Sequence, residues 1–281
     1  MTMRNSLRAF AILISSFPLL QVLSQPLMAA ESHEEFHLPD NAQGKPISFV
    51  SCPVVQDSSS VPCWFAESEG TRYFIGIQQE IGADFHPPQL NHQVLVEGRI
   101  LEGVELCGAP VIHPVTISVL PEIDRNCNEI VPAIPGIEPP PHERGPGPSN
   151  DGLEPREERV PEAMPEPPFQ AQEFIIPFTF DSTMMRGTVT REISRAMNYA
   201  RHIDASAINI LVHRGSSLLS SGEEIVEQAR IVESRSDALR TIFREAGFAD
   251  SLVNVVPVAQ PLRGDGSDDH ELRRAVITVE P

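Results

Sequence analysis

Four cysteines are the residues whose type and number most directly predict chemistry in this sequence. Cys52, Cys63, Cys107 and Cys127 all lie in the first half of the chain. In an exported protein, an even number of cysteines favours disulfides, here two. Three connectivities are possible, and we favour the sequence-near one, Cys52–Cys63 with Cys107–Cys127. Zinc is the rival hypothesis, but none of the spacings has the paired Cys-x-x-Cys form that is typical of zinc sites.

Motifs for catalysis or cofactor binding are missing from the sequence. It contains no Gly-x-Ser-x-Gly elbow, no His-Glu-x-x-His and no phosphate-binding glycine loop. Asp265, Asp268 and Asp269 lie close together, but their spacing does not fit an EF-hand, so we interpret them as an acidic hairpin loop. His86 and His92 are interpreted as surface residues rather than metal ligands. We therefore expect no enzymatic activity, no catalytic residue, no metal and no cofactor.

Export is predicted by the first 30 residues. Arg4 and Arg8 form a positive n-region, residues 9–23 form a short apolar segment, and Met28-Ala29-Ala30 offers a small-residue cleavage site. The alternative is an uncleaved membrane anchor, but a spanning helix needs about 20 apolar residues. We expect a signal peptide over residues 1–30, a periplasmic location, and no membrane insertion after cleavage.

The charge of the chain excludes one class of partner. There are 21 Lys and Arg against 39 Asp and Glu, which gives a formal net charge of −18. A phosphate backbone would repel such a chain unless it carried a dense basic stripe, and the sequence contains none. We therefore expect no nucleic-acid partner.

A proline-rich segment divides the chain. Between Pro132 and Pro168 there are 12 prolines in 37 residues, together with Glu and Gly and without Phe, Trp or Tyr. Such a segment cannot bury enough apolar surface to offset its ordering entropy. Residues 132–168 are therefore predicted to be an extended linker, and we favour plain spacing over a proline-rich docking motif.

The part before the linker, residues 31–131, is predicted to be an all-β domain that contains the disulfides. Five short apolar segments predict strands, at residues 47–50, 63–66, 72–77, 94–100 and 115–120. Gly, Pro and Asn separate them, which favours a small closed barrel of OB-like type. Such barrels often bind oligosaccharides. Trp64, Tyr73 and Phe74 could form a stacking surface, but their place inside apolar segments favours a core role.

The part after the linker, residues 169–281, has an α+β pattern of strand, helix, strand, helix, strand, strand. The first helix is indicated by Ile193, Ala196, Met197, Ala200 and Ile203, which recur at helical spacing. The second is predicted to begin at the capping-box sequence Ser221-Gly222-Glu223-Glu224 and to end at Gly247. The predicted strands are 174–180, 207–212, 252–256 and 275–279.

This order, with certain residues, resembles the OmpA/MotB-like C-terminal domain, a periplasmic module that binds peptidoglycan. Phe180-Asp181-Ser182 matches the Phe-Asp end of the family's first strand. Residues 231–239, with Arg235 inside, stand where the family has Leu-Ser-x-x-Arg-Ala-x-x-Val. Leu272-Arg273-Arg274-Ala275-Val276 stands where the last strand opens with Asn-Arg-Arg-Val. The resemblance covers residues 171–281 and is divergent.

The resemblance implies a binding site for the diaminopimelate of the peptidoglycan stem. In the family, an Asp after the second strand acts with the helix Arg. Arg235 would contact the ligand carboxylate, because a guanidinium is a planar, two-pronged donor. Gly215 stands where the Asp is expected, so the ammonium group loses its partner, and the loop 216–221 is longer than in the family. Arg214, Glu223 and Glu224 are the neighbours that could compensate.

Plainer interpretations of these arginines stay open. Arg235 could be an amphipathic-helix arginine whose stem covers apolar surface while its head stays in water. Arg214 could be a solvated loop residue. Arg273 and Arg274 are interpreted as the start of an edge strand, where charge discourages unwanted pairing.

Three functional hypotheses follow from the sequence. The first is a non-enzymatic periplasmic envelope protein, associated with the cell wall or outer membrane, whose OmpA-like domain contacts peptidoglycan. The second keeps the fold but makes it a protein–protein interaction module of an envelope complex that has lost peptidoglycan binding. The third makes the N-terminal barrel the active part, binding a glycan or small ligand. The expected partners are thus peptidoglycan and envelope proteins.

Overall fold

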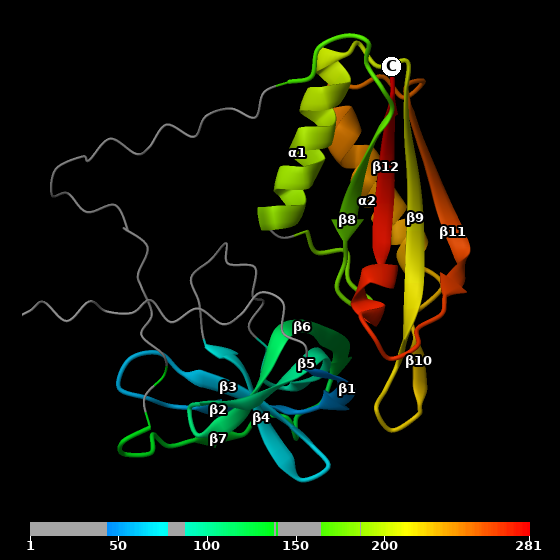
Figure 1. Cartoon of the computed structure of the whole chain (residues 1–281). Coiled ribbons are helices and arrows are strands. Elements are labelled where there is room, and N and C mark those ends of the chain that lie inside the picture. The colour runs from blue at the N-terminus through cyan, green and yellow to red at the C-terminus, as the bar shows by residue number, and fades with distance from the viewer. Residues whose placement is uncertain (1–43, 78–87, 138, 140–163, 186) are drawn as a thin grey trace, which may run out of the picture. The chain divides into compact units, whose positions relative to one another are not determined.

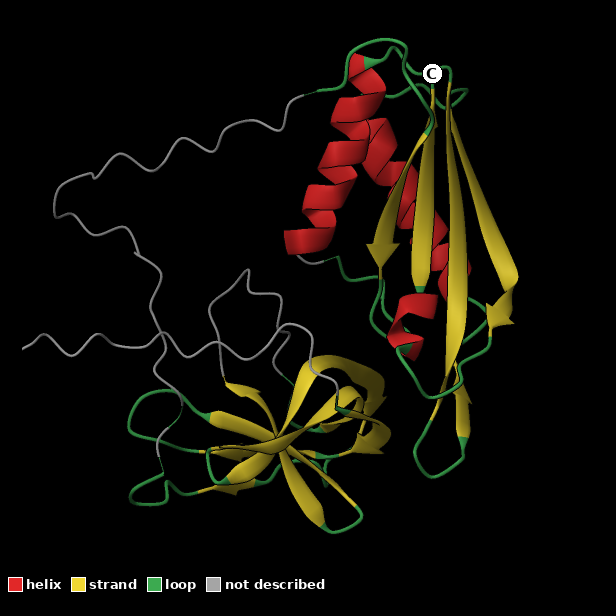
Figure 2. Ribbon diagram, in the orientation of Figure 1, coloured by secondary structure: helices red, strands yellow, loops and turns green. Residues whose placement is uncertain are grey.

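The computed structural model describes residues 44–77, 88–137, 139, 164–185 and 187–281 (Figure 1). The predicted signal peptide, His86 and most of the predicted linker lie outside the described residues. Within them, strands dominate, accompanied by two α-helices and a short 3-10 helix (Figure 2). In this described part, no helix combines the length and the apolarity needed to cross a membrane.

The N-terminal sheet has seven strands. They are β1 (Lys45–Ser51), β2 (Pro53–Gln56), β3 (Cys63–Ser68), β4 (Thr71–Ile77), β5 (His92–Leu106), β6 (Ala109–Ile123) and β7 (Ile130–Val131). Their order in the sheet is β1-β5-β6-β4-β3-β2-β7. The five predicted strands coincide with β1, β3, β4, β5 and β6, whereas β2 and β7 escaped prediction because both are very short. Trp64 and Phe74 are buried, which confirms their core role.

The predicted closed barrel is wrong. Among the described residues, β1 pairs only with β5 and β7 only with β2, so the two ends of the strand order are not joined. The long strands β5 and β6 instead bend through register shifts, one of them between Gly98 and Ile100. A Cβ atom on Gly98 would lie 2.4 Å from the Pro114 carbonyl oxygen, so this bend requires glycine. The sheet consequently packs around two separate apolar clusters.

Two disulfides form, as predicted in number, but the favoured pairing is wrong. The bridges are Cys52–Cys127 and Cys63–Cys107, with Cα–Cα distances of 4.8 and 6.5 Å. Cys52 directly precedes β2 and Cys127 lies shortly before β7, and these two strands pair in parallel. The strand pairing therefore selects distant cysteines as neighbours, which sequence proximity could not indicate.

The C-terminal part forms a second sheet with two helices. Its elements are β8 (Gln172–Pro177), α1 (Gly187–His202), β9 (Ala207–Leu218), β10 (Glu224–Val226), α2 (Ile231–Glu245), β11 (Val253–Leu262), η1 (Asp269–Leu272) and β12 (Arg274–Glu280). The strand order is β8-β12-β9, with β11 parallel to β9 and β10 antiparallel to its end. Both helices cover the same face of this sheet (Figures 1 and 2).

The core of this part confirms the helical periodicity of the sequence. All five predicted core residues, four in α1 and Ile203 directly after it, are buried against alternate residues of the strands, among them Ile176, Ile210 and Ile277. The second helix, however, begins at Ile231 rather than at Ser221. Residues 221–226 form a turn and β10, because Glu224 accepts a hydrogen bond from Ser216 on the facing strand instead of capping a helix.

Arg273 corrects a second expectation. It is fully buried next to β12, which is a central strand between β8 and β9 rather than an edge strand. Its guanidinium pairs with Glu97 of β5 in a two-pronged contact, and Ser217 hydrogen-bonds to the same carboxylate. Further hydrogen bonds join Phe180 to Ser118 and Ser48 to Ser220. Arg273, which was predicted to discourage pairing at a sheet edge, thus pairs with a carboxylate of the N-terminal sheet.

Candidate functional site

Arg235 lies where four segments of the C-terminal part converge. It projects from the second turn of α2 and is fully buried. Its guanidinium carbon lies 4.6 Å from the ring centroid of Phe178, which follows β8, a cation–π distance. The other neighbours come from the connection between β8 and α1, from the middle of β9, and from the segment between β10 and α2. Arg235 therefore lies on the second helix, as predicted, but its side chain is buried in the interior of the C-terminal part.

Every N–H group of Arg235 is used within the chain. Nε donates to the carbonyl of Ser182 at 2.9 Å. Nη1 donates to the carbonyl of His213 at 3.3 Å and to Oε2 of Glu227 at 3.1 Å. Nη2 donates to the carbonyl of Thr179 at 3.0 Å and to Oε1 of Glu227 at 2.5 Å. A guanidinium has five N–H donors, so none is left over for a ligand.

Glu227 is the functional partner that sequence reasoning missed. Its carboxylate also accepts from the backbone N–H of Asp181 at 2.8 Å and from that of Gly215 at 2.9 Å. With the two bonds from Arg235, the four acceptor positions of a carboxylate are filled. Both side chains of this ion pair are completely shielded from solvent. The only sequence signal was an acidic residue eight positions before Arg235, in a segment that we had assigned to the helix.

Asp181 adds a second carboxyl group beside this pair. Its Oδ1 accepts a hydrogen bond from the backbone N–H of Gln228 at 2.7 Å. Burial raises the pKa of Asp181, and the negative charge of Glu227 raises it further, against the hydrogen bonds from Gln228 and the charge of Arg235. The Phe-Asp match of the sequence therefore marks a residue that holds the connection from β8 to α1 against the start of α2.

Gly215 occupies a crowded position rather than an open one. A Cβ atom there would lie 3.0 Å from Cβ of Leu272 and 3.2 Å from Cγ of Arg273. Glycine therefore suits this position because a larger side chain would crowd Leu272 and Arg273.

The remaining predicted residues are dispersed. Arg214 donates to the carbonyls of Ala259 and Glu227, which ties β9 to β11 and to the segment before α2. Glu224 accepts from Ser216 at 2.7 Å and also binds Arg263, and the hydrogen bond from Ser216 is the main cause that lowers the pKa of Glu224. Glu223 is exposed in the turn. None of these three side chains is hydrogen-bonded to the guanidinium of Arg235.

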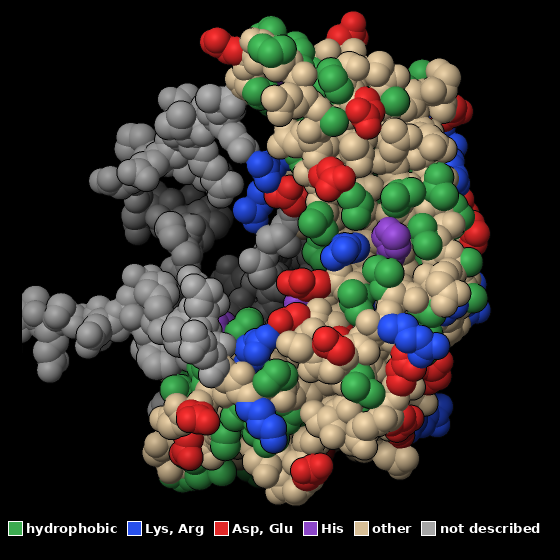
Figure 3. Space-filling model, turned by 45° about the vertical axis from the view of Figure 1, so that its right-hand side comes forward, with side chains coloured by type: hydrophobic (Ala, Val, Ile, Leu, Met, Phe, Trp, Pro, Cys, Tyr) green, Lys and Arg blue, Asp and Glu red, His purple; other side chains and the backbone are tan. Residues whose placement is uncertain are grey.

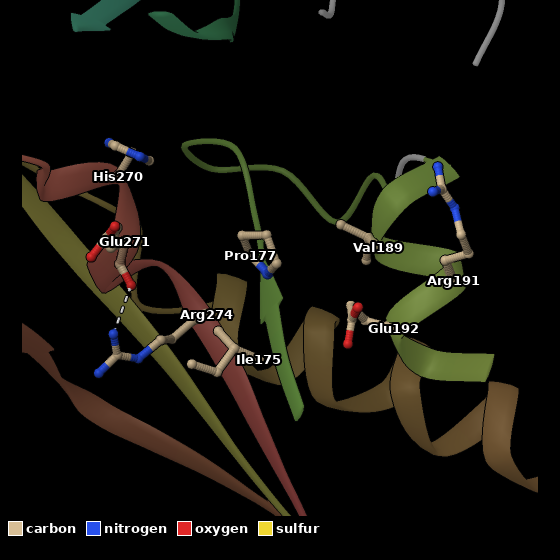
Figure 4. A pocket seen from close by; sticks show the side chains of 8 residues that line it. All are labelled: Ile175, Pro177, Val189, Arg191, Glu192, His270, Glu271 and Arg274. Atoms are coloured by element: carbon tan, nitrogen blue, oxygen red, sulfur yellow. Dashed lines mark hydrogen bonds between the residues drawn. The ribbon is translucent and has the colours of Figure 1, made fainter. Parts of the chain in front are cut away.

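An open recess lies elsewhere in the C-terminal part. It has a volume of about 520 Å³ and is lined by Ile175, Pro177, Val189, Arg191, Glu192, His270, Glu271 and Arg274. Figure 4 shows His270, Glu271 and Arg274 on one side, α1 on the other, and the two β8 residues between them. Apolar side chains form its middle and charged ones its rim. Unlike the Arg235 site, this recess is open to solvent.

Comparisons with known proteins found similar solved structures. No protein-family model matches the chain, and no curated protein matches it. The OmpA-like domain of FopA1 from Francisella tularensis is similar in structure, with 13% identity, 40% of this chain and 73% of that chain covered, and a TM-score of 0.30. A putative MotB-like protein from Desulfovibrio vulgaris has 15% identity, 40% and 76% coverage, and a TM-score of 0.32.

Both structures are OmpA-like or MotB-like by name, as the resemblance in the sequence predicts, and each match covers 40% of this chain. At these identities, the similarity concerns the fold alone. Neither structure specifies a ligand or a partner for this chain.

Proposed function

We propose that this chain is a non-enzymatic cell-envelope protein whose OmpA/MotB-like part serves as a protein–protein interaction module. In this proposal, Arg235 is a structural residue rather than a receptor for a stem-peptide carboxylate. The observation that carries the proposal is the buried, fully hydrogen-bonded pair of Arg235 and Glu227.

The energetics of this pair support the proposal. A ligand carboxylate at Arg235 would have to displace Glu227, which is held by four hydrogen bonds and lies out of solvent. The displaced carboxylate would leave the backbone N–H groups of Asp181 and Gly215 without their acceptor. Leaving one member of a buried ion pair uncompensated costs about 3–5 kcal/mol. A ligand contact would first have to offset that cost, so this chain satisfies the arginine internally.

The proposed compartment rests on the sequence and on the disulfides. The N-terminal 30 residues have the pattern of a signal peptide. Two disulfides account for all four cysteines, and disulfides persist in oxidising compartments such as the periplasm. We propose that the mature protein works there, with other envelope proteins as its partners. The competing function, contact with peptidoglycan, stays a prediction that the following experiment separates.

Co-sedimentation with purified peptidoglycan tests the proposal. The full mature chain is compared with Arg235→Lys and with Glu223→Gln, a matched change at an exposed residue beside the site. We expect no sedimentation that depends on Arg235 and no competition by free diaminopimelate. If the wild-type chain sediments at low salt, diaminopimelate releases it, and Arg235→Lys abolishes binding while remaining folded by circular dichroism, the proposal is overturned and the peptidoglycan hypothesis replaces it.

A further inference from the structure

We propose that the uncovered face of the C-terminal sheet, together with the adjoining recess, binds an acidic, amphipathic segment of a partner protein. This inference rests on the proposed interaction function and names the surface and the partner's chemistry. The open face is defined here by its central residues Ile175, Val276, Leu211 and Val256, and the recess is the cavity of Figure 4.

An apolar row crosses the open face. Val276 of β12 is paired in register with Ile175 of β8 and with Leu211 of β9, and Leu211 is paired with Val256 of β11. Because strands lie about 4.8 Å apart, the four side chains form a continuous row roughly 14 Å long. Ile175, Leu211 and Val256 are 53%, 42% and 39% exposed. A sheet with an apolar row on both faces is normally covered on both, and here the helices cover only one.

The two flanks of the apolar row differ in charge. On one flank lie Arg274 of β12 and His213 of β9, whose partners in register are Pro177 and Val258. On the other flank, Thr278 is paired with Glu173 and with Asn209, and Asn254 donates to Asn209 at 3.3 Å. Figure 3 shows a histidine and hydrophobic side chains, with basic and acidic ones around them, on the face that it presents. One flank therefore carries the cation Arg274 beside a histidine, and the other carries Glu173 among neutral side chains, on a chain whose net charge is −18.

The basic flank carries hydrogen-bonding atoms without a partner. Nε of Arg274 and Nδ1 of both His213 and His270 are buried and make no hydrogen bond among the described residues. Arg274 and His270 line the recess, and Nη1 of Arg274 donates only to the backbone carbonyl of Glu271, at 3.2 Å. Buried polar groups without partners are uncommon in native proteins. A carboxylate placed beside Arg274 would accept from its guanidinium and complement the positive charge.

The acids in the recess do not supply that carboxylate. Glu192 lines the recess, but its carboxylate is paired with Arg195 at 2.8 Å. Glu271 is exposed, and it is the backbone oxygen of this residue that Arg274 contacts. The carboxylate must therefore come from the occupant. The apolar side chains of the occupant would contact Ile175 and Pro177 in the recess and then the apolar row as far as Val256.

Charge also distinguishes the kinds of occupant. On the apolar row and its two flanks, Glu173 is the one acidic residue, and it lies on the flank opposite Arg274. A second copy that used the same face would therefore offer only this carboxylate. A different protein segment, with Asp or Glu next to Leu, Ile or Val, fits both the apolar row and the basic flank.

Selection from random peptides displayed on phage tests the inference. The library is panned on the full mature chain, and the selected peptides are synthesised and measured by fluorescence anisotropy. We expect enrichment of Asp and Glu next to branched apolar residues, and binding that weakens as salt is added. Arg274→Gln and Leu211→Ser should each lower the affinity of the selected peptides about tenfold or more. Charge reversal by Arg274→Glu should favour peptides in which Lys replaces the acids.

The controls are changes of the same kind elsewhere. Ile123→Ser alters a hydrophobic residue of the N-terminal sheet that is 72% exposed, and Arg263→Gln alters an arginine whose side chain is 70% exposed. Both variants should bind the selected peptides as the wild type does. The inference is overturned if the selected peptides lack acidic residues, or if folded Arg274→Gln and Leu211→Ser variants bind them unchanged.

Other outcomes assign the surface to another occupant and equally overturn the inference. They are a dimer, seen by light scattering, that Leu211→Ser dissociates, or binding to anionic vesicles that the same variant abolishes. Co-sedimentation with peptidoglycan that depends on Arg235 would instead refute the proposed function, because Arg235 belongs to a different site. Because Leu211 and Arg274 make no hydrogen bond or ion pair with Arg235 or Glu227, the two failures can be told apart.

Discussion

Glu227 holds the guanidinium of Arg235 with both of its carboxylate oxygens, and neither side chain is exposed to solvent. The two lie eight positions apart, yet the pair joins the connection after β8, strand β9 and helix α2, because Glu227 also accepts hydrogen bonds from the backbone N–H groups of Asp181 and Gly215. The arginine that the resemblance assigns to ligand binding therefore holds segments of the chain together in this structure. This relationship yields the first two predictions.

Removal of the negative partner should destabilise the protein strongly. Glu227→Gln leaves the buried charge of Arg235 uncompensated, and we expect a loss of about 3–5 kcal/mol in the free energy of unfolding. Chemical denaturation of the full mature chain measures this loss. The matched change Glu223→Gln, at an exposed residue, should stay within about 0.5 kcal/mol of wild type. Equal stability of the two variants would contradict the structural role of the pair.

Asp181→Asn should stabilise the protein near neutral pH. Burial, and then the charge of Glu227, raise the pKa of Asp181 in the folded state above its unfolded value. The folded state therefore holds this proton more tightly, and ionisation of Asp181 costs stability above the raised pKa. Asparagine keeps the acceptor for Gln228 without the charge, and it tolerates the positive φ of 49° at this position.

The effect of Asp181→Asn should depend on pH in a defined direction. The gain in melting temperature is present above the raised pKa. It shrinks as the pH falls through that pKa, and it disappears below the ordinary value of 3.8, where the carboxyl group is protonated in both states. Thermal unfolding of both proteins at pH 7.5 and at successively lower pH measures this. A gain that grows toward acid pH would be the wrong sign.

The disulfide pairing can be read directly. Digestion without reduction, followed by mass spectrometry, should yield peptides that link Cys52 to Cys127 and Cys63 to Cys107. Replacement of Cys52 and Cys127 together by serine should cost about 2–5 kcal/mol. The bridge between Cys63 and Cys107 closes a shorter segment, of separation 44 against 75, so its loss should cost slightly less in the chain-entropy model. Linked peptides of Cys52 with Cys63 would refute the pairing.

Glu97→Gln should lower the stability of the C-terminal sheet. The change leaves the buried Arg273 without its counter-charge, although the two residues are 176 positions apart. We expect a loss of stability of about 3–5 kcal/mol. Hydrogen exchange of the backbone amides around Ser217 and in β12 should also become faster. Glu102→Gln, an exposed change on the same strand β5, is the control. Unchanged exchange in β12 would show that the contact with Glu97 contributes little.

Local patterns in the sequence predicted much of the fold correctly. The apolar spacing from Ile193 to Ile203 predicted the core face of α1, and the segments around Ile208 and Ile277 predicted two central strands. These signals are reliable because hydrophobic periodicity is set by neighbouring residues within one element. Where a local pattern fits two structures, it misleads. Ser221 to Glu224 has capping-box spacing, yet Glu224 bonds to Ser216 in a hairpin, and helix α2 starts at Ile231.

The sequence by itself determined the charge and predicted most of the strands, both helices and the number of disulfides. Only the tertiary structure decided which residues meet. Cys52 with Cys127, Arg273 with Glu97 and Arg235 with Glu227 are pairs in which a buried group requires a particular partner, and each partner lies outside the local pattern of the first residue. The physical reason is that desolvation makes a buried charge depend on its nearest atoms, and the packing of distant segments supplies those atoms.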